Sequence, residues 1–171
     1  DFQYGFLTPK VVKYVTKLAT KYGIKILADQ QSSSQSGKLN KYKNIYAVFP
    51  TEKEARLTTD DWESSLEVIG KKIININDAK FCVLKLADEG LIVFEKDSNN
   101  RFTLPALSAS PVDVAGAGDS LLSATAYGIC KGLTFFESVV LGSIQSSIAV
   151  ENIGNIPIAK DELMNKLKQV L

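Results

Sequence analysis

The chain has no histidine among its 171 residues. Catalytic triads built on a Ser–His or Cys–His pair are therefore excluded, as are metal sites that depend on imidazole ligands. Any proton transfer must use Asp, Glu, Lys, Tyr or Cys. The missing residue type thus narrows the enzyme classes that the chain can represent.

Cysteine is scarce. Cys82 lies in an apolar, strand-like stretch and Cys130 in an apolar, helical one. We interpret both as buried free thiols, because nothing in the sequence indicates an oxidising compartment in which a disulfide would form.

Excess charge and long apolar runs are also missing. The 20 basic and 19 acidic residues give a net charge of +1, so no strong field attracts nucleic acid or an acidic membrane. No apolar run approaches the roughly 20 residues of a transmembrane helix, and no signal peptide is recognised at the start. We therefore expect a cytoplasmic protein with neither a nucleic-acid nor a membrane partner.

Apolar spacing predicts that helices alternate with strands. Thr8 and Gly23 cap a first helix, and Asp60 with Glu63 forms a capping box for a later one. A second capping box joins Thr134 and Glu137. The expected helices cover residues 9–22, 51–57, 61–75 or 61–79, 120–131, 135–151 and 160–171. The expected strands cover residues 24–28, 45–49, 81–86, 91–95 and 101–107, with the third and fourth antiparallel.

This alternation indicates an α/β fold with a mainly parallel sheet sandwiched by helices, in one domain spanning residues 1–171. Ligands of such sheets bind beyond the carboxyl ends of the strands. Asp29, Pro50–Thr51 and the turn at residues 87–90 all follow strand ends. We expect them to share one rim with a glycine turn at residues 113–119.

The glycine turn reads Asp113-Val114-Ala115-Gly116-Ala117-Gly118-Asp119 and precedes a helix. Unpaired amides and the helix dipole make such a turn an anion site. The Asp119 carboxylate would repel a phosphate bound at this turn. Its presence is explained if it removes a proton from a hydroxyl that then attacks that phosphate. The turn has neither the P-loop ending nor the dinucleotide-binding spacing. A tight connection without a ligand remains the alternative.

The segment 113–120 resembles the second signature of the ribokinase/PfkB carbohydrate kinases, Asp-Thr-x-Gly-Ala-Gly-Asp. Four other segments resemble motifs of the same family, and they are Asp29 after a strand, Pro50–Glu54, Lys85–Gly90 and Ile148–Gly154. The resemblance runs through the whole chain and is strongest to the branch of heptose-phosphate kinase domains of ADP-heptose synthesis. It implies a ribokinase-like fold.

The family resemblance implies phosphoryl transfer from ATP to a hydroxyl of a sugar or sugar phosphate. Asp119 would be the catalytic base, and the backbone of Gly116, Ala117 and Gly118 would stabilise the transferred phosphoryl group. Glu54, with Thr51, would act on Mg²⁺ through water. A monovalent cation is a further candidate, near Asp113. The residues expected around the nucleotide are Lys85, Ala87, Glu89, Gly90, Asp113, Ser143, Gln145 and Asn152.

Structural alternatives remain open for most of these positions. Asp113 either holds the turn or a cation, or is a solvated loop carboxylate. Glu54 is either a metal residue or a solvated charge in a first helical turn. Residues 85–90 could form a plain hairpin turn, and the polar residues of the helix at 135–151 could face solvent.

The sequence departs from the family pattern at several positions. Thr51 replaces Asn, Ala87 replaces a frequent Gly, Gln30-Gln31 replaces Pro-Lys/Asn and Ala115 replaces a frequent Thr. These departures leave a non-catalytic nucleotide-binding or regulatory module as an alternative function. A vitamin kinase of the same superfamily is another, although those relatives more often have a Gly-Thr-Gly-Cys-type turn.

A complete family member has a further N-terminal half, with a Gly-Gly signature, most sugar-binding residues and a β-sheet lid. Asp1–Gly5 resembles the loop in the middle of such a protein. We therefore expect this chain to be the C-terminal, nucleotide-binding part, with the missing half as its partner and a homodimer as an option for the intact protein. Alone it should be inactive or weak, and it should expose a sheet edge and apolar surface.

Overall fold

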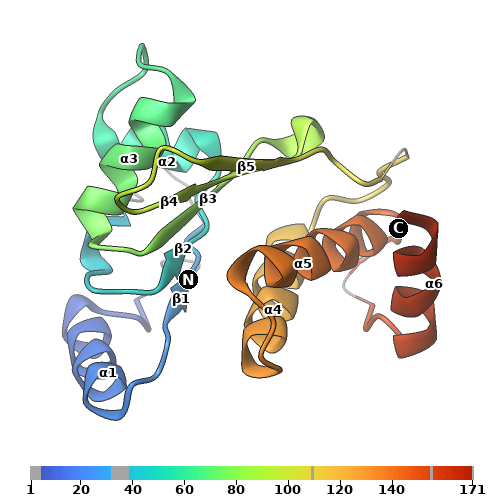
Figure 1. Ribbon diagram of the computed structural model, residues 1–171, viewed down its shortest axis with the longest axis horizontal. Helices are drawn as coiled ribbons and strands as arrows, with labels where there is room; N and C mark the ends of the chain where they lie inside the picture. The colour runs from blue at the N-terminus through green and yellow to red at the C-terminus, as the bar shows by residue number, and fades with distance from the viewer. Residues whose placement is uncertain (1–4, 32–38, 109, 155, 171) are drawn as a thin grey trace. The chain divides into compact units, whose positions relative to one another are not determined.

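The computed structural model describes residues 5–31, 39–108, 110–154 and 156–170. Figure 1 shows the helices and strands along the chain. Contacts divide the chain into two compact units, which we describe separately. Unit 1 comprises Asp1–Ala87 and Leu91–Thr103, and unit 2 comprises Asp88–Gly90 and Leu104–Leu171. The single domain expected over residues 1–171 stays a prediction.

Unit 1 contains a five-stranded sheet in the order β1-β2-β3-β4-β5. The strands are β1 (Leu27–Ala28), β2 (Ala47–Val48), β3 (Phe81–Lys85), β4 (Leu91–Glu95) and β5 (Arg101–Leu104). Strands β1, β2 and β3 are parallel, with Leu27, Ala47 and Phe81 in register. Strands β3 and β4 are antiparallel, which confirms that prediction. Both β1 and β2 are shorter than expected.

Three helices of unit 1 contribute to one core with the sheet. They are α1 (Pro9–Tyr22), α2 (Glu52–Thr59) and α3 (Leu66–Asn77), and a short helix η1 (Leu39–Lys41) lies between β1 and β2. The core brings together apolar residues from all these elements and from the strands, namely Val12, Ala28, Leu39, Tyr42, Ile45, Val48, Ala55, Ile69, Ile73, Ile74, Ala79, Cys82, Leu84 and Phe94. Burial of this apolar surface is the main stabilising contribution in the unit.

Helix α1 has the predicted ends, because the Thr8 hydroxyl accepts a hydrogen bond from the Val11 amide at 3.3 Å and Gly23 adopts a left-handed φ of 65°. The apolar residues of this helix are spaced along one face, which is only partly buried. Val12 and Ala19 lie in the interior. The other apolar residues on that face are exposed, and they are Val11, Val15, Leu18 and Tyr22.

The capping box expected at Asp60 and Glu63 is wrong. Helix α3 begins five residues later than Asp61, with Ser65 as its N-cap. Asp60 instead ends α2 in a left-handed conformation, with φ of 51°. The Asp61 carboxylate accepts the amides of Glu63 and Ser64 at 3.2 and 3.0 Å, so these residues form a turn.

The segment that follows η1 is fixed to the end of α3 by Asn77. This side chain is fully buried, and its amide nitrogen donates to the carbonyls of Leu39 and Tyr42, both at 2.7 Å. The Asn77 carbonyl in turn accepts the Asn44 amide at 2.9 Å. Residues 39–44 are therefore held against the core by buried hydrogen bonds, which are costly to break.

Unit 2 contains α4 (Ala117–Cys130), α5 (Phe135–Val150) and α6 (Lys160–Val170). The capping box of Thr134 and Glu137 is confirmed at the start of α5. Lys166 on α6 forms an ion pair of 2.7 Å with Glu151 after α5. No helix in the part of the chain that the structure describes is long and apolar enough to cross a membrane.

The two cysteines differ in environment. Cys82 is buried, as predicted, whereas Cys130 at the end of α4 is exposed, so the prediction for Cys130 is wrong. Both thiols are free. The apolar residues around Cys130 in the sequence belong to several faces of α4, and sequence alone does not show which face is covered.

Helices α4 and α5 pack closely where α5 carries Gly142. A Cβ atom at this position would lie 2.5 Å from the Thr125 hydroxyl oxygen and 2.6 Å from the Leu121 carbonyl oxygen. Thr125 cannot easily move, because it is fully buried and donates a hydrogen bond of 2.7 Å to that carbonyl. The close approach of the two helices therefore requires glycine here.

We predict that Gly142→Ala lowers the free energy of unfolding by about 2–3 kcal/mol, because overpacking of a tight core forces its neighbours apart. Without this contact the same change would stabilise the helix by up to about 1 kcal/mol. Urea titration followed by circular dichroism measures the difference. Ser146→Ala, at a partly exposed position of α5, is the control and should change stability by less than about 0.5 kcal/mol. A more stable Gly142→Ala variant would contradict the close packing.

Candidate functional site

The carboxyl edge of the three parallel strands in unit 1 carries four polar residues. Asp29 directly follows β1, Thr51 and Glu54 follow β2, and Lys85 ends β3. The Lys85 amide donates to the Pro50 carbonyl at 2.8 Å, and Thr51 forms a parallel bridge with Lys85. Unit 1 thus brings these residues together at one edge, as the strand pattern predicts.

Asp29 and Lys85 form a largely buried ion pair across this edge. The Lys85 ammonium donates to both carboxylate oxygens, at 2.8 and 2.9 Å, and both side chains are less than one-fifth exposed. Burial raises the pKa of the Asp29 carboxyl above its ordinary value, and the Lys85 ammonium only partly opposes this effect. The nearby Glu54 carboxylate raises the pKa of Asp29 further.

Glu54 is not a solvated charge, because its residue is only 6% exposed. Its carboxylate accepts the Thr51 amide at 2.8 Å, and the Thr51 hydroxyl accepts the Glu54 amide at 3.3 Å. The pair is a reciprocal capping box at the start of α2. Both residues therefore have a structural role beside the metal-binding role expected from the family motif.

The rim offers Mg²⁺ few direct ligands. Among the described residues no group of three or more Asp, Glu, Cys or His side chains could hold a metal ion. Mg²⁺ commonly keeps several of its waters and binds protein through one or two carboxylates. Glu54, with one carboxylate oxygen already bonded to the Thr51 amide, fits contact with the ion through water.

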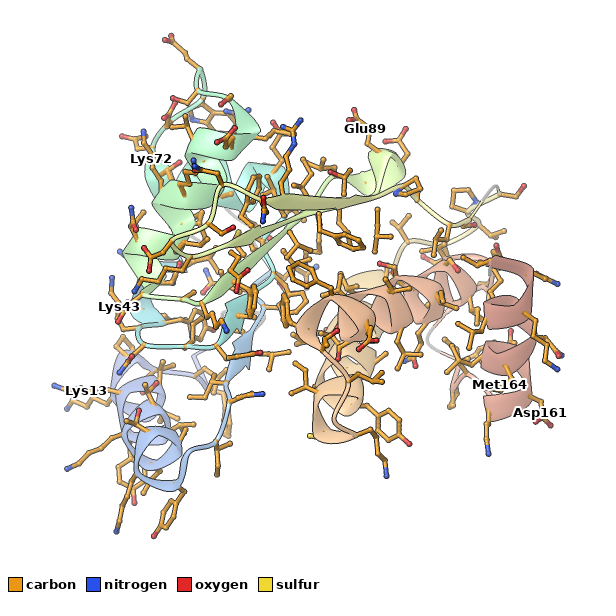
Figure 2. All side chains as sticks on the ribbon, viewed as in Figure 1. Lys13, Lys43, Lys72, Glu89, Asp161 and Met164 are labelled. Atoms are coloured by element: carbon orange, nitrogen blue, oxygen red, sulfur yellow. The ribbon has the colours of Figure 1, made fainter. Side chains whose placement is uncertain are left out.

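The connection between the antiparallel strands β3 and β4 contains a short helix, η2 (Ala87–Glu89), and its contact with a nucleotide stays a prediction. Ala87 is exposed and adopts φ of 54°, a left-handed conformation that is unfavourable for a residue with a Cβ atom. Gly90 also has a positive φ, of 95°. Glu89 is exposed at the outer side of this turn, as Figure 2 shows.

The glycine turn of unit 2 leads directly into α4. Gly116 is its N-cap with φ of 78°, and no side chain caps the helix. The Ala117 amide donates to the Val114 carbonyl at 3.3 Å, so the amides of Gly118 and Asp119 are the donors of the first turn that remain for a ligand. Asp119 is the third residue of α4, and it is exposed.

Asp113 anchors this turn. One carboxylate oxygen accepts the Ala115 amide at 2.9 Å and the other accepts the Gly154 amide at 3.0 Å. The backbone amides of Val112 and Asp113 both donate to the Val150 carbonyl at the end of α5. The amides of Ala115 and Gly154 hold the pKa of Asp113 below its ordinary value. These contacts support the turn-holding role, and a cation at Asp113 stays a prediction.

The polar residues expected beside adenine lie in and after α5. Ser143 is 9% exposed, and its hydroxyl has no hydrogen-bond partner among the described residues, so it does not face solvent. Gln145 is partly exposed. The Asn152 side chain donates to the Ile148 carbonyl at 3.0 Å. Their contact with a nucleotide stays a prediction.

The predicted site residues are divided between the two units. Unit 1 contains Asp29, Thr51, Glu54, Lys85 and Ala87. Unit 2 contains the remaining ones, which are Glu89, Gly90, Asp113, Gly116, Ala117, Gly118, Asp119, Ser143, Gln145 and Asn152. Each unit positions its own residues, and a common rim that includes the glycine turn remains a prediction.

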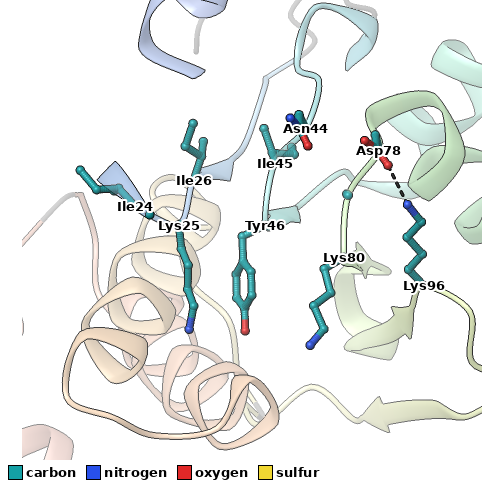
Figure 3. Close-up of a pocket in the computed structure, with 11 residues that line it drawn as sticks. Ile24, Lys25, Ile26, Asn44, Ile45, Tyr46, Asp78, Lys80 and Lys96 are labelled. Carbon is teal, nitrogen blue, oxygen red and sulfur yellow. Dashed lines mark hydrogen bonds and ion pairs between the residues drawn. The ribbon is translucent and has the colours of Figure 1, made fainter. Parts of the chain in front are cut away.

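A pocket of about 400 Å³ lies at the opposite, amino edge of the parallel strands in unit 1. Lys25 and Lys80 lie on either side of Tyr46 in this pocket, as Figure 3 shows, and the Lys25 ammonium is 4.7 Å from the Tyr46 ring centroid. None of the predicted site residues lines it. The pocket is therefore distinct from the carboxyl edge.

Sequence reasoning missed the pairing of Asp29 with Lys85 and the burial of Gln30. Gln30 is 1% exposed, although it belongs to a polar stretch that indicated a loop. Asp29 was recognised only as a motif position. The signal that could have indicated this pair is that residues of opposite charge lie at the carboxyl ends of two parallel strands of one sheet.

The ion pair gives a prediction for the titration of Asp29. We expect the titration midpoint of the Asp29 carboxyl carbon, followed by NMR, to lie above the ordinary pKa of 3.8. Lys85→Met should raise this midpoint further, because the ammonium lowers the pKa of Asp29. Since the folded pKa exceeds the unfolded one, Asp29 favours folding at low pH and loses that contribution as pH rises through the folded pKa. Glu54→Gln is the opposite control and should lower the midpoint. A midpoint below 3.8 in the unmodified chain would contradict this account.

Ala87 gives a second prediction. Ala87→Gly should raise the free energy of unfolding by about 0.5–1 kcal/mol, because the relief of left-handed strain exceeds the entropy lost by glycine. Ala106→Gly, at an exposed position without a positive φ, should instead lower it. Thermal and urea unfolding measure both changes. Equal destabilisation by the two variants would show that Ala87 is not strained.

Comparisons with a family model and with curated proteins agree on one family. The family model described as pfkB family carbohydrate kinase matches residues 7–161. Among curated proteins, the bifunctional protein HldE of Campylobacter jejuni subsp. doylei is 30% identical over 166 residues, which are 95% of this chain and 34% of that protein. HldE of Aliarcobacter butzleri is 26% identical over 95% of this chain and 33% of its own length. The chain thus spans about a third of these relatives.

Solved structures show the same fold. Arabidopsis thaliana ribokinase complexed with ribose and ATP superposes with a TM-score of 0.81 at 22% identity, over 94% of this chain and 53% of that one. Phosphofructokinase-2 from Escherichia coli in complex with potassium gives a TM-score of 0.79 at 20% identity, over 96% and 53%. The fold is therefore ribokinase-like, and the chain belongs to the pfkB family of carbohydrate kinases.

Proposed function

We propose that the chain is the nucleotide-binding part of an ATP-dependent kinase that phosphorylates a hydroxyl of a sugar or sugar phosphate. The observation that carries this proposal is the start of α4. Asp119 is exposed in its first turn, beside amides that no side chain caps. A carboxylate and free amide donors in one turn suit a reaction in which a hydroxyl loses a proton and a phosphoryl group gains a bond.

Asp119 is the proposed general base. Its carboxylate accepts the proton of the acceptor hydroxyl while that oxygen forms a bond to the γ-phosphorus of ATP. The bond from the γ-phosphorus to the oxygen that bridges it to the β-phosphate breaks, and ADP leaves with the electron pair. Such catalysis depends mainly on positioning and on charge stabilisation, which is consistent with the few reactive groups available in a chain without histidine.

The backbone at the start of α4 is the proposed anion site for the transferred phosphoryl group. The amides of Gly118 and Asp119 supply the donors, because the Ala117 amide already donates to the Val114 carbonyl. The family motif includes Gly116, Ala117 and Gly118. In this chain Gly116 contributes chiefly through its left-handed φ, which turns the chain into the helix. The tether from Asp113 supports a fixed position of this turn.

ATP and Mg²⁺ are the proposed cofactors. A bound Mg²⁺ would neutralise charge on the phosphates, and Glu54 would hold its water ligands with support from Thr51. Lys85, kept at the edge by Asp29, places a positive charge where an anionic nucleotide could bind. The turn at 87–90, together with Ser143 and Asn152, is proposed to border the nucleotide.

The substrate proposal rests on the relatives. Because HldE proteins match this chain, we favour a heptose phosphate as the acceptor. The chain covers about half of the ribokinase-like neighbours, so we propose that the other half supplies most of the sugar site. The exposed apolar residues on α1 would be covered by that half, and these are Val11, Val15, Leu18 and Tyr22. We expect the 171-residue chain alone to phosphorylate sugars slowly or not at all.

A non-catalytic nucleotide-binding module is the second candidate. Two observations favour it: Lys85 is engaged by Asp29, and the Thr51 hydroxyl is engaged by the capping box. Side chains that already form an ion pair or a hydrogen bond have less capacity to stabilise a transition state. The two functions differ in one measurable respect, because a module would bind ATP without transferring its γ-phosphate in the presence of any sugar.

The test uses the protein extended upstream to the length of its relatives, assayed with a panel of sugars and sugar phosphates that includes a heptose phosphate. Asp119→Asn should lower kcat by about 10²–10⁴, the usual contribution of a general base. The Kd for ATP should change less than about threefold. Asp161→Asn, in the first turn of α6 (Figure 2) and also exposed, is the matched control and should leave kcat unchanged. Full activity of Asp119→Asn would refute the base, and ATP binding without turnover in the unmodified protein would favour the module.

A further inference from the structure

The positive charge of this nearly neutral chain is concentrated in one region. Residues 5–50 contain eight lysines and a single carboxylate, Asp29, whereas the whole chain has a net charge of +1. Asp29 is paired with Lys85 at the carboxyl edge of the sheet. Because Lys85 lies outside this region, the eight lysines form a local excess of positive charge that the net charge conceals.

Five of these lysines line one groove in unit 1. The groove has a volume of about 640 Å³ and runs between α1 and the segment that follows η1. No carboxylate is among the residues that line it, which are Pro9, Lys13, Thr16, Lys17, Thr20, Lys21, Lys41, Lys43 and Asn44. Like charges repel, and an anion between the walls would offset this repulsion.

The first wall is a straight row of side chains on α1. Lys13, Lys17 and Lys21 are spaced four residues apart, so they lie above one another on the same face of the helix. The helix has no acidic residue in its sequence. Among the described residues, Lys13 and Lys17 take part in no ion pair. Their charges face solvent or a ligand.

The second wall is held by the core. Asn77 fixes residues 39–44 through three buried or backbone hydrogen bonds, and the Lys43 ammonium donates to the Ile76 carbonyl. The Lys41 ammonium donates to the Leu7 carbonyl at 3.4 Å. Figure 2 shows Lys13 and Lys43 at the same margin of unit 1. The groove is therefore formed before a ligand arrives, which lowers the entropy cost of binding.

We propose that this lysine groove binds a chain of linked phosphates, as in inorganic polyphosphate, at a site separate from the kinase site. Thr16 and Thr20 use their hydroxyl protons on backbone carbonyls, at 2.9 and 3.0 Å, so the ammonium groups are the donors for the ligand. Ammonium ions act as point charges and do not require one orientation of the phosphate. A row of them suits a flexible chain of charges.

The lining favours a phosphate chain over other anionic polymers. Single-stranded nucleic acids need aromatic side chains on which bases stack, and no aromatic residue lines the groove. Membrane binding by a helix needs apolar residues flanking the cations and entering the bilayer. Exposed apolar residues such as Val11 and Val15 lie on α1 but not in the groove, and the proposed contact with the other half of the kinase would cover them.

The test is a calorimetric titration of the 171-residue chain with sodium tripolyphosphate at several salt concentrations. We expect saturable binding that weakens as salt increases. The double variant Lys13→Gln/Lys17→Gln should weaken binding at least about tenfold and reduce the slope of log K against log salt by about 2, one for each lost phosphate contact. Circular dichroism checks that the variant remains folded.

The matched control is Lys160→Gln/Lys168→Gln, which removes the same charge from exposed positions of α6. It should bind tripolyphosphate like the unmodified chain. The proposal is overturned if the control loses as much affinity as the groove variant or if no saturable binding occurs. Tighter binding of single-stranded RNA or of anionic vesicles than of polyphosphate also overturns it.

Discussion

The parallel register of β1, β2 and β3 is the constraint on which the rest of unit 1 depends. It places Asp29, Thr51 and Lys85 at one edge, although 56 residues separate the first from the last. A shift of one residue would turn each side chain to the other face of the sheet. The buried ion pair of Asp29 with Lys85 and the nearby Glu54 carboxylate put one ammonium and two carboxylates at this edge, which an isolated strand could not do.

Local signals in the sequence predicted local structure well. The ends of α1 at Thr8 and Gly23 and the capping box of Thr134 and Glu137 depend only on residues within a few positions of each other. The capping box expected at Asp60 and Glu63 did not form, because the neighbouring Asp61 carboxylate accepts the amides of Glu63 and Ser64 and closes a turn there. The exposure of the apolar face of α1 depends on what packs there, which spacing does not reveal.

The candidate site likewise has features that the sequence predicts and features that depend on tertiary contacts. The glycine turn, Asp119 at its end and the rim residues were all recognisable as motif positions in the sequence. The pairing of Asp29 with Lys85, the burial of Glu54 and the anchoring of Asp113 by Gly154 were not, because each depends on distant segments. Sequence patterns thus identify the types of residue that a reaction needs, and tertiary contacts decide which of them are already engaged.

The unequal environment of the two thiols has a practical consequence. Burial raises the pKa of Cys82 well above its ordinary value, so this thiol is both inaccessible and protonated. Cys130 is exposed at the end of the helix that begins beside Asp119. A maleimide fluorophore or spin label would therefore attach to one position without mutagenesis, and it would report on α4 from the end opposite to the glycine turn.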